Sequence, residues 1–526
     1  MILPAATQSE LHQQSAEPAP KRTIWLVLVL LVAIGTLLRY WMLGAKSLWL
    51  VEAFSLYVAR LSWPAFLRTM WWGEANMTLY YVLLRGWLHV ADSEFWLRSL
   101  SAVFGIAAIP AVYCFGSRFL TRKAGLMAAA FLAVNSFHVR YSQELRSYSL
   151  LALLVILSTC AFLAVFEAPE RKSRWLLYVL FSAAAVYAHM FAAFALASQW
   201  LVLTPSRIKR LGILRLLLSA AAIAILVAPV AAVVIFEHKE QLDWVPSLSL
   251  AGVTEVLQDI AGAGTTLRGQ ALPSVLLVLF VVAWAVALAS LFRSQPAARP
   301  EYATRAFALA LLSSGLVFPV AAMAALSLLK PILAPRYLIM CIPPASLLAG
   351  WGLASLQPLS KRARAISTAL FVIMLAVASL NTWAYFASFK TYGHNGRGVA
   401  RYVLSHAEPG DAIIFYTFSE HHVFEYYLMR QKEAGEVSAE PAMLFPLDLD
   451  RATIQKRTQP YGRVWLVLHQ TRATPLTDSQ TELIRAALLS HFHLATELNF
   501  PGQGVDRGES GAMSLALYTH LASGSD

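Results

Sequence analysis

Lys21-Arg22 and the apolar run that follows it, TIWLVLVLLVAIGTLLRYWML at 23–43, decide the class of fold. The run matches the roughly 20 residues that an α-helix needs to cross a bilayer. It is too long for the apolar core of a cleavable signal peptide, and a polar stretch precedes the basic pair. We therefore expect a retained first membrane span with a cytoplasmic N-terminal tail at 1–22.

Apolar runs of similar length recur along the 526 residues of the chain. The chain is 58% hydrophobic and only 14% charged, whereas an ordinary soluble protein carries roughly 25% charged residues. Lipid-facing helices explain this excess, so the sequence predicts an α-helical polytopic membrane protein with about eleven transmembrane helices. The spans after the first are expected at 100–117, 124–140, 147–166, 175–188, 190–204, 216–236, 272–292, 306–328, 337–356 and 365–386.

The basic residues lie between these spans rather than in one patch. The net charge of +12 therefore indicates no nucleic-acid partner. Alternate links are rich in Lys and Arg, which places them in the cytoplasm by the positive-inside rule, and an odd number of spans puts the C-terminal tail outside. Their basic residues are Lys21, Arg22, Arg118, Arg122, Lys123, Arg171, Lys172, Arg174, Arg207, Lys209, Arg210, Arg293, Arg299, Arg305, Lys361, Arg362 and Arg364.

Three larger segments are expected on the outer side. Segment 44–99 is rich in Trp and Tyr, which favours helices lying along the membrane interface, and 237–271 is the second segment. The third, 387–526, alternates strand-like and helix-like patterns, which predicts a small extracytoplasmic α/β domain after a transmembrane domain at 23–386. Its expected strands are Ala412–Tyr416, Val464–Leu468 and Ser514–Tyr518, and its expected helices are Val423–Met429 and Thr481–Leu489.

The cysteines and the tail histidines predict neither a disulfide framework nor a metal cluster. The three cysteines fall inside apolar runs, where free Cys usually packs as a small hydrophobe. The paired tail histidines show no ligand spacing and are expected at the surface. These residues are Cys114, Cys160, Cys341, His421, His422, His491 and His493.

Ionisable side chains collect at the outer ends of the predicted spans, where charge is costly and therefore suggests function. Carboxylates there can take a proton from a hydroxyl, and cations can hold a phosphate leaving group. Together they would suit a reaction on an anionic lipid headgroup. Alternatively, the arginines only snorkel to the headgroups, and the acids and the histidine are ordinary interfacial residues. The residues are Glu52, Glu144, Arg146, His189, Lys330 and Arg336.

Several motifs occur in an order typical of one family. They are Leu48-Trp-Leu-Val-Glu-Ala-Phe-Ser55, Leu79-Tyr-Tyr-Val-Leu-Leu84, Arg98, Tyr141-Ser-Gln-Glu-Leu-Arg-Ser-Tyr-Ser-Leu150, Tyr187-Ala-His189, Pro335-Arg-Tyr337, Arg397-Gly-Val-Ala-Arg-Tyr402 and Pro409-Gly-Asp411. With them, the chain resembles the C-type (GT-C) glycosyltransferases, in the bacterial branch related to protein O-mannosyltransferases and lipid A aminoarabinose transferases. The resemblance covers most of the chain.

The resemblance implies an inverting hexosyl or pentosyl transferase of the inner membrane. Such an enzyme moves a sugar from a polyprenyl-phosphate carrier to an acceptor hydroxyl of a glycan, lipid or protein on the outer side. Nucleotide sugars are cytoplasmic, so an outward-facing transferase needs a donor carried by lipid. The resemblance also implies which residues act in catalysis and which contact the phosphate of the donor, and it is compatible with a divalent metal. The catalytic residues would be Glu52 and Glu144, and the phosphate-binding residues Arg146, His189, Lys330, Arg336 and Tyr337.

One position departs from the family pattern. Val51 stands where relatives usually carry an aspartate that serves as the catalytic base. Either Glu52 has taken that role, or another acid of the first outer segment (Glu74, Asp92 or Glu94) has, or the protein is an inactive binding or scaffolding relative. A transporter is a further alternative, but it would favour repeated halves with charges at mid-membrane, and neither pattern is found.

Overall fold

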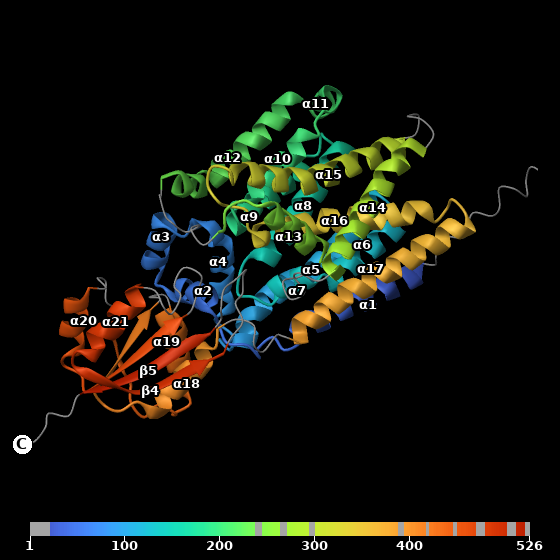
Figure 1. The fold of residues 1–526 in the computed structure, drawn as a ribbon. Coiled ribbons are helices and arrows are strands. Elements are labelled where there is room, and N and C mark those ends of the chain that lie inside the picture. Colours follow the sequence, from blue (N-terminus) through green and yellow to red (C-terminus); the bar gives the residue numbers. More distant parts are fainter. Residues whose placement is uncertain are drawn as a thin grey trace, which may run out of the picture.

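The computed structural model describes residues 21–236, 245–262, 271–293, 300–387, 394–416, 420–444, 450–469, 479–501 and 512–520. A helical bundle and a smaller sheet domain lie at opposite ends of an elongated molecule (Figure 1). The bundle holds α1 (Lys21–Tyr40), α5 (Glu94–Phe119), α6 (Arg122–Val134), α7 (Ser136–Ser142), α8 (Tyr148–Glu167), α9 (Lys172–Ala188), α10 (Ala192–Leu201), α11 (Pro205–Leu211), α12 (Ile213–Phe236), α13 (Leu250–Ala261), α14 (Ala271–Arg293), α15 (Pro300–Leu326), η3 (Pro335–Cys341), α16 (Ile342–Leu356) and α17 (Lys361–Ala387).

Eight helical segments of the described chain are long and apolar enough to cross a membrane. They are Arg22–Tyr40, Glu94–Phe119, Tyr148–Glu167, Ile213–Val233, Ala271–Phe292, Ala303–Leu326, Pro335–Leu356 and Lys361–Ala387. The polytopic helical fold is therefore confirmed, while the number eleven stays a prediction. The three other expected spans are shorter helices: 124–140 is divided between α6 and α7, and 175–188 and 190–204 are α9 and α10.

Both interruptions have a local cause. Asn135 takes an extended backbone conformation (ψ 112°) and its side chain accepts a hydrogen bond from the His138 N–H, so it ends α6 and caps α7. His189 is also extended (φ −165°, ψ 128°) and ends α9. This second break leaves the His189 side chain at a turn instead of on a helix surface.

The first outer segment forms the expected interfacial helices: α2 (Leu50–Arg60), α3 (Trp63–Trp72), η2 (Ala75–Met77) and α4 (Thr78–Trp87). Helix α3 buries Phe66 and Met70 but exposes Trp63, Trp71 and Trp72. Indole rings with a polar N–H favour the boundary between lipid and water. The exposed face of α3 therefore suits the membrane surface.

The sheet domain contains α18 (Gly396–His406), β1 (Asp411–Tyr416), α19 (His421–Glu433), β2 (Ala442–Leu444), α20 (Arg451–Thr458), β3 (Arg463–His469), α21 (Ser479–Leu489), β4 (Phe492–Phe500) and β5 (Met513–His520). The strand order is β2-β1-β3-β5-β4, in which β2, β1 and β3 are parallel and β5 runs antiparallel to its two neighbours. The three predicted strands and two predicted helices are confirmed.

Side chains alternate between the two faces of the sheet, as the strand period requires. Ile413 and Phe415 of β1 face α18 and α19 in the core that continues into the bundle, whereas Ala412 and Ile414 face α20 and α21. One face of the domain therefore packs toward the membrane part, and the other face is closed by its own helices.

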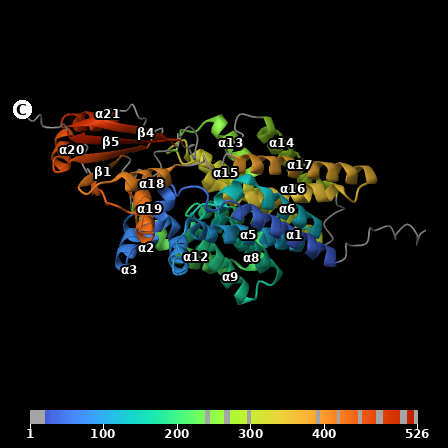
Figure 2. The same ribbon diagram turned by 90° about the horizontal axis from the view of Figure 1, so that it is seen from below.

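Helix α19 packs against α2, so the sheet domain rests on the interfacial helices beside the bundle (Figures 1 and 2). The Leu48 N–H donates to the Tyr427 hydroxyl at 2.8 Å, and Arg397 pairs with Glu94 at 2.8 Å. Asp92 accepts from both Arg60 and Arg430. These contacts fix the tail on the first outer segment. The expected domain limits at 22/23 and 386/387 stay predictions, and residues 388–393 lie outside the described residues.

Candidate active site

Glu52 lies at the third position of α2 and is completely buried. Arg98 of α5 donates two hydrogen bonds to its carboxylate, from Nε to Oε1 at 2.8 Å and from Nη2 to Oε2 at 2.6 Å. The Leu145 N–H donates to Oε1 at 2.9 Å, and the Trp49 N–H donates to Oε2 at 3.4 Å. The carboxylate thus joins α2, α5 and the turn before α8.

Two effects act on the pKa of Glu52. Burial alone raises this pKa, but the charge and hydrogen bonds of Arg98 oppose it and leave the pKa of Glu52 below its ordinary value. Arg98 also donates to the carbonyl oxygens of Leu43, Lys46 and Ser47. A carboxylate that is ionised, sealed and held by four donors is poorly placed to receive a proton from an acceptor.

Glu144 follows α7 and is also buried, but its surroundings differ. Its Oε1 lies 3.5 Å from Arg140 Nε, and within the described chain neither carboxylate oxygen makes a hydrogen bond of good geometry. Burial raises the pKa of Glu144, while the charges of Arg140 and the buried Lys46 oppose that rise. Burial in turn lowers the pKa of Lys46 to about 8. This acid therefore sits among cations without close hydrogen bonds.

A second charged group forms around Arg146 at the same end of the bundle. Its Nη1 donates to the Ser55 hydroxyl at 3.2 Å, and its guanidinium faces the ring of Tyr148. The side chain of Arg336 lies over the ring of Tyr337. Burial and then the charges of Arg146 and Arg336 lower the pKa of His189 to about 3, so the imidazole is neutral.

Aromatic rings and an amide surround His189. Its ring centroid lies 5.1 Å from that of Tyr337 and 5.9 Å from that of Tyr148. Asn76 Nδ2 lies 3.5 Å from His189 Nε2, and the Met190 N–H donates to Asn76 Oδ1 at 2.9 Å. The first outer segment therefore supplies one wall of this group.

Glu74 stands beside the same group and is only half-buried. The Tyr81 hydroxyl donates to Glu74 Oε1 at 3.0 Å. Burial lowers the pKa of Arg146, but the charges of Tyr148, Tyr81 and Glu74 more than offset it and leave that pKa above its ordinary value. Glu74 is thus an acid at the edge of the cationic group that an incoming molecule can reach.

The structure brings six of the seven sequence-predicted residues to this end of the bundle: Glu52, Glu144, Arg146, His189, Arg336 and Tyr337. Lys330 is exposed after α15, and no ion pair or hydrogen bond joins its side chain to another described residue. Val51 packs against Trp49 in an apolar contact. The two groups of described residues that could hold a metal ion belong to the sheet domain.

The helical bundle, the interfacial helices and the charged end below the sheet domain define the GT-C fold. ArnT from Cupriavidus metallidurans, solved free and bound to undecaprenyl phosphate, superposes with a TM-score of 0.54 at 12% identity. The superposition with the free form covers 95% of this chain and 98% of ArnT.

The oligosaccharyltransferase of Archaeoglobus fulgidus superposes with a TM-score of 0.51 at 12% identity, over 92% of this chain and 73% of that protein. No protein-family profile and no curated protein sequence matches the chain. At such low identity the likenesses establish the fold, and the chemistry has to be argued from the residues themselves.

Proposed function

We propose that this multi-pass membrane protein is a glycosyltransferase that moves a sugar from a polyprenyl-phosphate carrier to an acceptor hydroxyl. The observation that carries the proposal is geometric: Arg146 lies over the ring of Tyr148 and Arg336 over the ring of Tyr337, and these two rings flank His189. Two neighbouring guanidiniums repel each other unless an anion lies between them, and Arg binds phosphate oxygens in pairs. That ArnT was solved with undecaprenyl phosphate bound supports the same ligand chemistry here.

A place for the lipid chain lies close by. A cavity of about 300 Å³ opens between α13, α14, α15 and α16, with an almost entirely apolar lining that includes Phe280, Trp284 and Leu348. Helix α13 packs against η3, the segment that carries Arg336 and Tyr337. A polyprenyl tail in this cavity would leave its phosphate free to reach the arginines, since apolar surface binds apolar chains.

The base in this proposal is Glu74 instead of Glu52. The carboxylate oxygens of Glu52 already accept hydrogen bonds from Arg98 and two backbone N–H groups. Glu74 is only half-buried, so an acceptor can reach it. A general base must come within about 2.6–3.2 Å of the proton it takes. Glu144 is the other candidate, because its carboxylate is engaged only loosely by Arg140.

The reaction then balances without a further reactant. The acceptor oxygen attacks the anomeric carbon and gives its proton to Glu74. The bond between that carbon and the phosphate oxygen breaks, and the phosphate leaves with the electron pair toward Arg146 and Arg336, which stabilise the developing charge. Attack opposite the leaving group inverts the anomeric configuration. The acceptor side would be the extracytoplasmic face of the inner membrane, by the alternation of basic links.

A transfer assay tests this assignment. The purified protein in lipid would receive polyprenyl-phosphate donors carrying hexoses or pentoses, and released polyprenyl phosphate would be measured. We expect Glu74→Gln to lower the rate about 10²–10⁴-fold, the usual loss of a general base. Glu433→Gln is the matched control, because Glu433 is exposed on α19 of the sheet domain. If Glu144→Gln abolishes sugar transfer and Glu74→Gln does not, Glu144 is the base.

If neither the unmodified protein nor any variant turns over a donor, the result would support the alternative that Val51 suggests, an inactive binding protein. The archaeal oligosaccharyltransferase has also been solved with an acceptor peptide tethered by a disulfide bond. The identity of the acceptor here is therefore the next variable in the same assay, with glycan, lipid and peptide hydroxyls offered in turn.

A further inference from the structure

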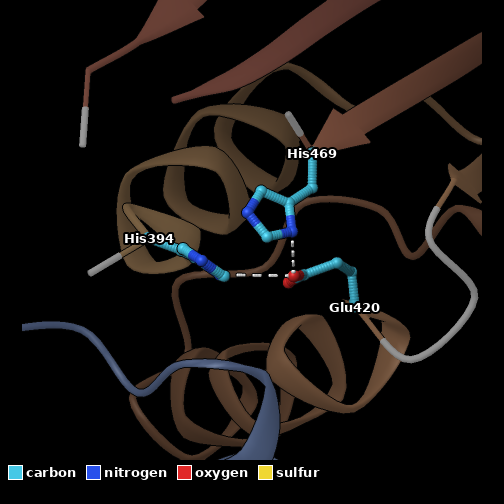
Figure 3. Close-up of side chains that lie close together, drawn as sticks. All are labelled: His394, Glu420 and His469. Carbon is cyan, nitrogen blue, oxygen red and sulfur yellow. Dashed lines mark ion pairs between the residues drawn. The ribbon is translucent and has the colours of Figure 1, made fainter. Parts of the chain in front are cut away.

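Three side chains of the sheet domain meet where it joins the membrane part. His394 follows α17 and precedes α18, Glu420 stands directly before α19, and His469 ends β3. Figure 3 shows the three side chains pointing toward one another. None of them was singled out by the sequence, because 25 or more positions separate each from the next along the chain.

The three groups are sealed from water, with exposed fractions of 4%, 1% and 4% for His394, Glu420 and His469. Glu420 Oε1 lies 3.4 Å from His394 Nδ1 and 3.0 Å from His469 Nδ1, and the two imidazole centroids are only 3.6 Å apart. Within the described chain, neither nitrogen of His394 and neither oxygen of Glu420 makes a hydrogen bond of good geometry. Buried polar groups arranged in this way call for a shared partner.

We propose that His394, Glu420 and His469 bind a divalent metal ion, with zinc as the preferred occupant. Imidazole nitrogen and carboxylate oxygen are common zinc ligands, with bonds of about 2.0–2.2 Å. Tetrahedral geometry then places ligand atoms about 3.4 Å apart. The three potential ligand atoms already lie within 4.8 Å of one another, so only small side-chain movements are needed.

A second histidine group nearby is the weaker candidate. His421, His422 and Glu425 also come together, but His422 stacks on Tyr57 at 4.3 Å between ring centroids. His422 and Glu425 lie on one helix and are less buried. The His422 ring therefore already has a packing role, and this group supplies a control for the first.

The site would fasten the sheet domain to the membrane part. His394 packs edge-on against Trp49 of the first outer segment, with ring centroids 6.1 Å apart. A metal there would tie the connection after α17 to the start of α19 and the end of β3. This role differs from the proposed transfer reaction, and it does not depend on it.

Metal content of the purified full-length protein tests the proposal. After treatment with chelator, loading with Zn²⁺ and desalting, we expect about one zinc ion per chain by mass spectrometry, and a zinc-dependent rise in unfolding temperature. His394→Gln and His469→Gln should lose the bound zinc and the zinc-dependent stabilisation, whereas His422→Gln should keep both.

Cobalt substitution keeps the test decisive if a variant fails to fold. Co²⁺ bound to the unmodified protein should give the visible absorption of a tetrahedral nitrogen and oxygen site, and Zn²⁺ should displace it. No retained Zn²⁺ or Co²⁺ in the unmodified protein would overturn the proposal. Zinc kept by His394→Gln and His469→Gln, or lost only in His422→Gln, would overturn the assignment of ligands.

Discussion

Replacing Glu52 by Gln should destabilise the protein before it affects chemistry. The Glu52–Arg98 pair is completely buried, and each carboxylate oxygen accepts from the guanidinium. Glutamine keeps the size of the side chain, but its amide N–H₂ would face the Arg98 donors and leave a buried charge without compensation. Breaking such a pair costs roughly 3–5 kcal/mol of unfolding free energy. The same change should therefore lower the unfolding temperature by several degrees.

Thermal unfolding in lipid nanodiscs measures this effect, with Glu433→Gln as the exposed control. The double variant Glu52→Gln with Arg98→Gln should lose less than the sum of the two single changes, because removing both partners relieves the unpaired charge. A Glu52→Gln protein that unfolds at the temperature of the unmodified protein yet transfers no sugar would refute this reasoning and return Glu52 to the role of base.

The pH dependence has a definite sign. The pKa of Glu52 is lowered in the folded protein, so its contribution to stability is fully present above the ordinary value of 4.5 and is lost as the pH falls through the folded value. The unfolding temperature of the unmodified protein should therefore drop more steeply in acid than that of Glu52→Gln. Parallel curves for the two proteins would contradict this assignment.

Further predictions concern the donor group and the topology. His189 stays neutral above about pH 5, since its pKa is about 3, so His189→Gln should change the rate of transfer without moving the pH profile. Arg336→Ala should weaken binding of polyprenyl phosphate about tenfold or more, as loss of a charge-assisted contact does, while exposed Arg401→Ala should not. In a cysteine-free background, a cysteine at Ser405 should be labelled in intact cells and one at Ser173 should not; the reverse pattern would invert the topology.

The apolar runs were enough to predict the helical membrane fold, because lipid imposes length and composition on each span. Strands β1, β3 and β5 were also predictable, since they are short, largely buried apolar runs. Strand β2 has only three residues, and β4 alternates with exposed polar side chains at the sheet edge, so neither stood out. The break at Asn135 depends on a cap that apolar periodicity does not reveal.

The candidate site was predictable only in part. Its arginines and His189 follow spans at one face, so topology alone brought them together. The ion pair between Glu52 and Arg98 could not be predicted from the sequence, because the two residues are 46 positions apart and meet only through helix packing. The same holds for His394 and His469, which only the folded sheet places around Glu420. Side chains that meet through tertiary contacts leave no local pattern in the sequence.

A density map of the protein with a polyprenyl phosphate bound would show directly where the donor phosphate lies. We expect phosphate density between the guanidiniums of Arg146 and Arg336, beside His189, with the lipid chain running into the cavity lined by Phe280 and Trp284. Glu74 should face the side of the phosphate from which an acceptor enters. Phosphate density at exposed Lys330 or at the cytoplasmic end, with no density at the two arginines, would contradict the proposed donor site.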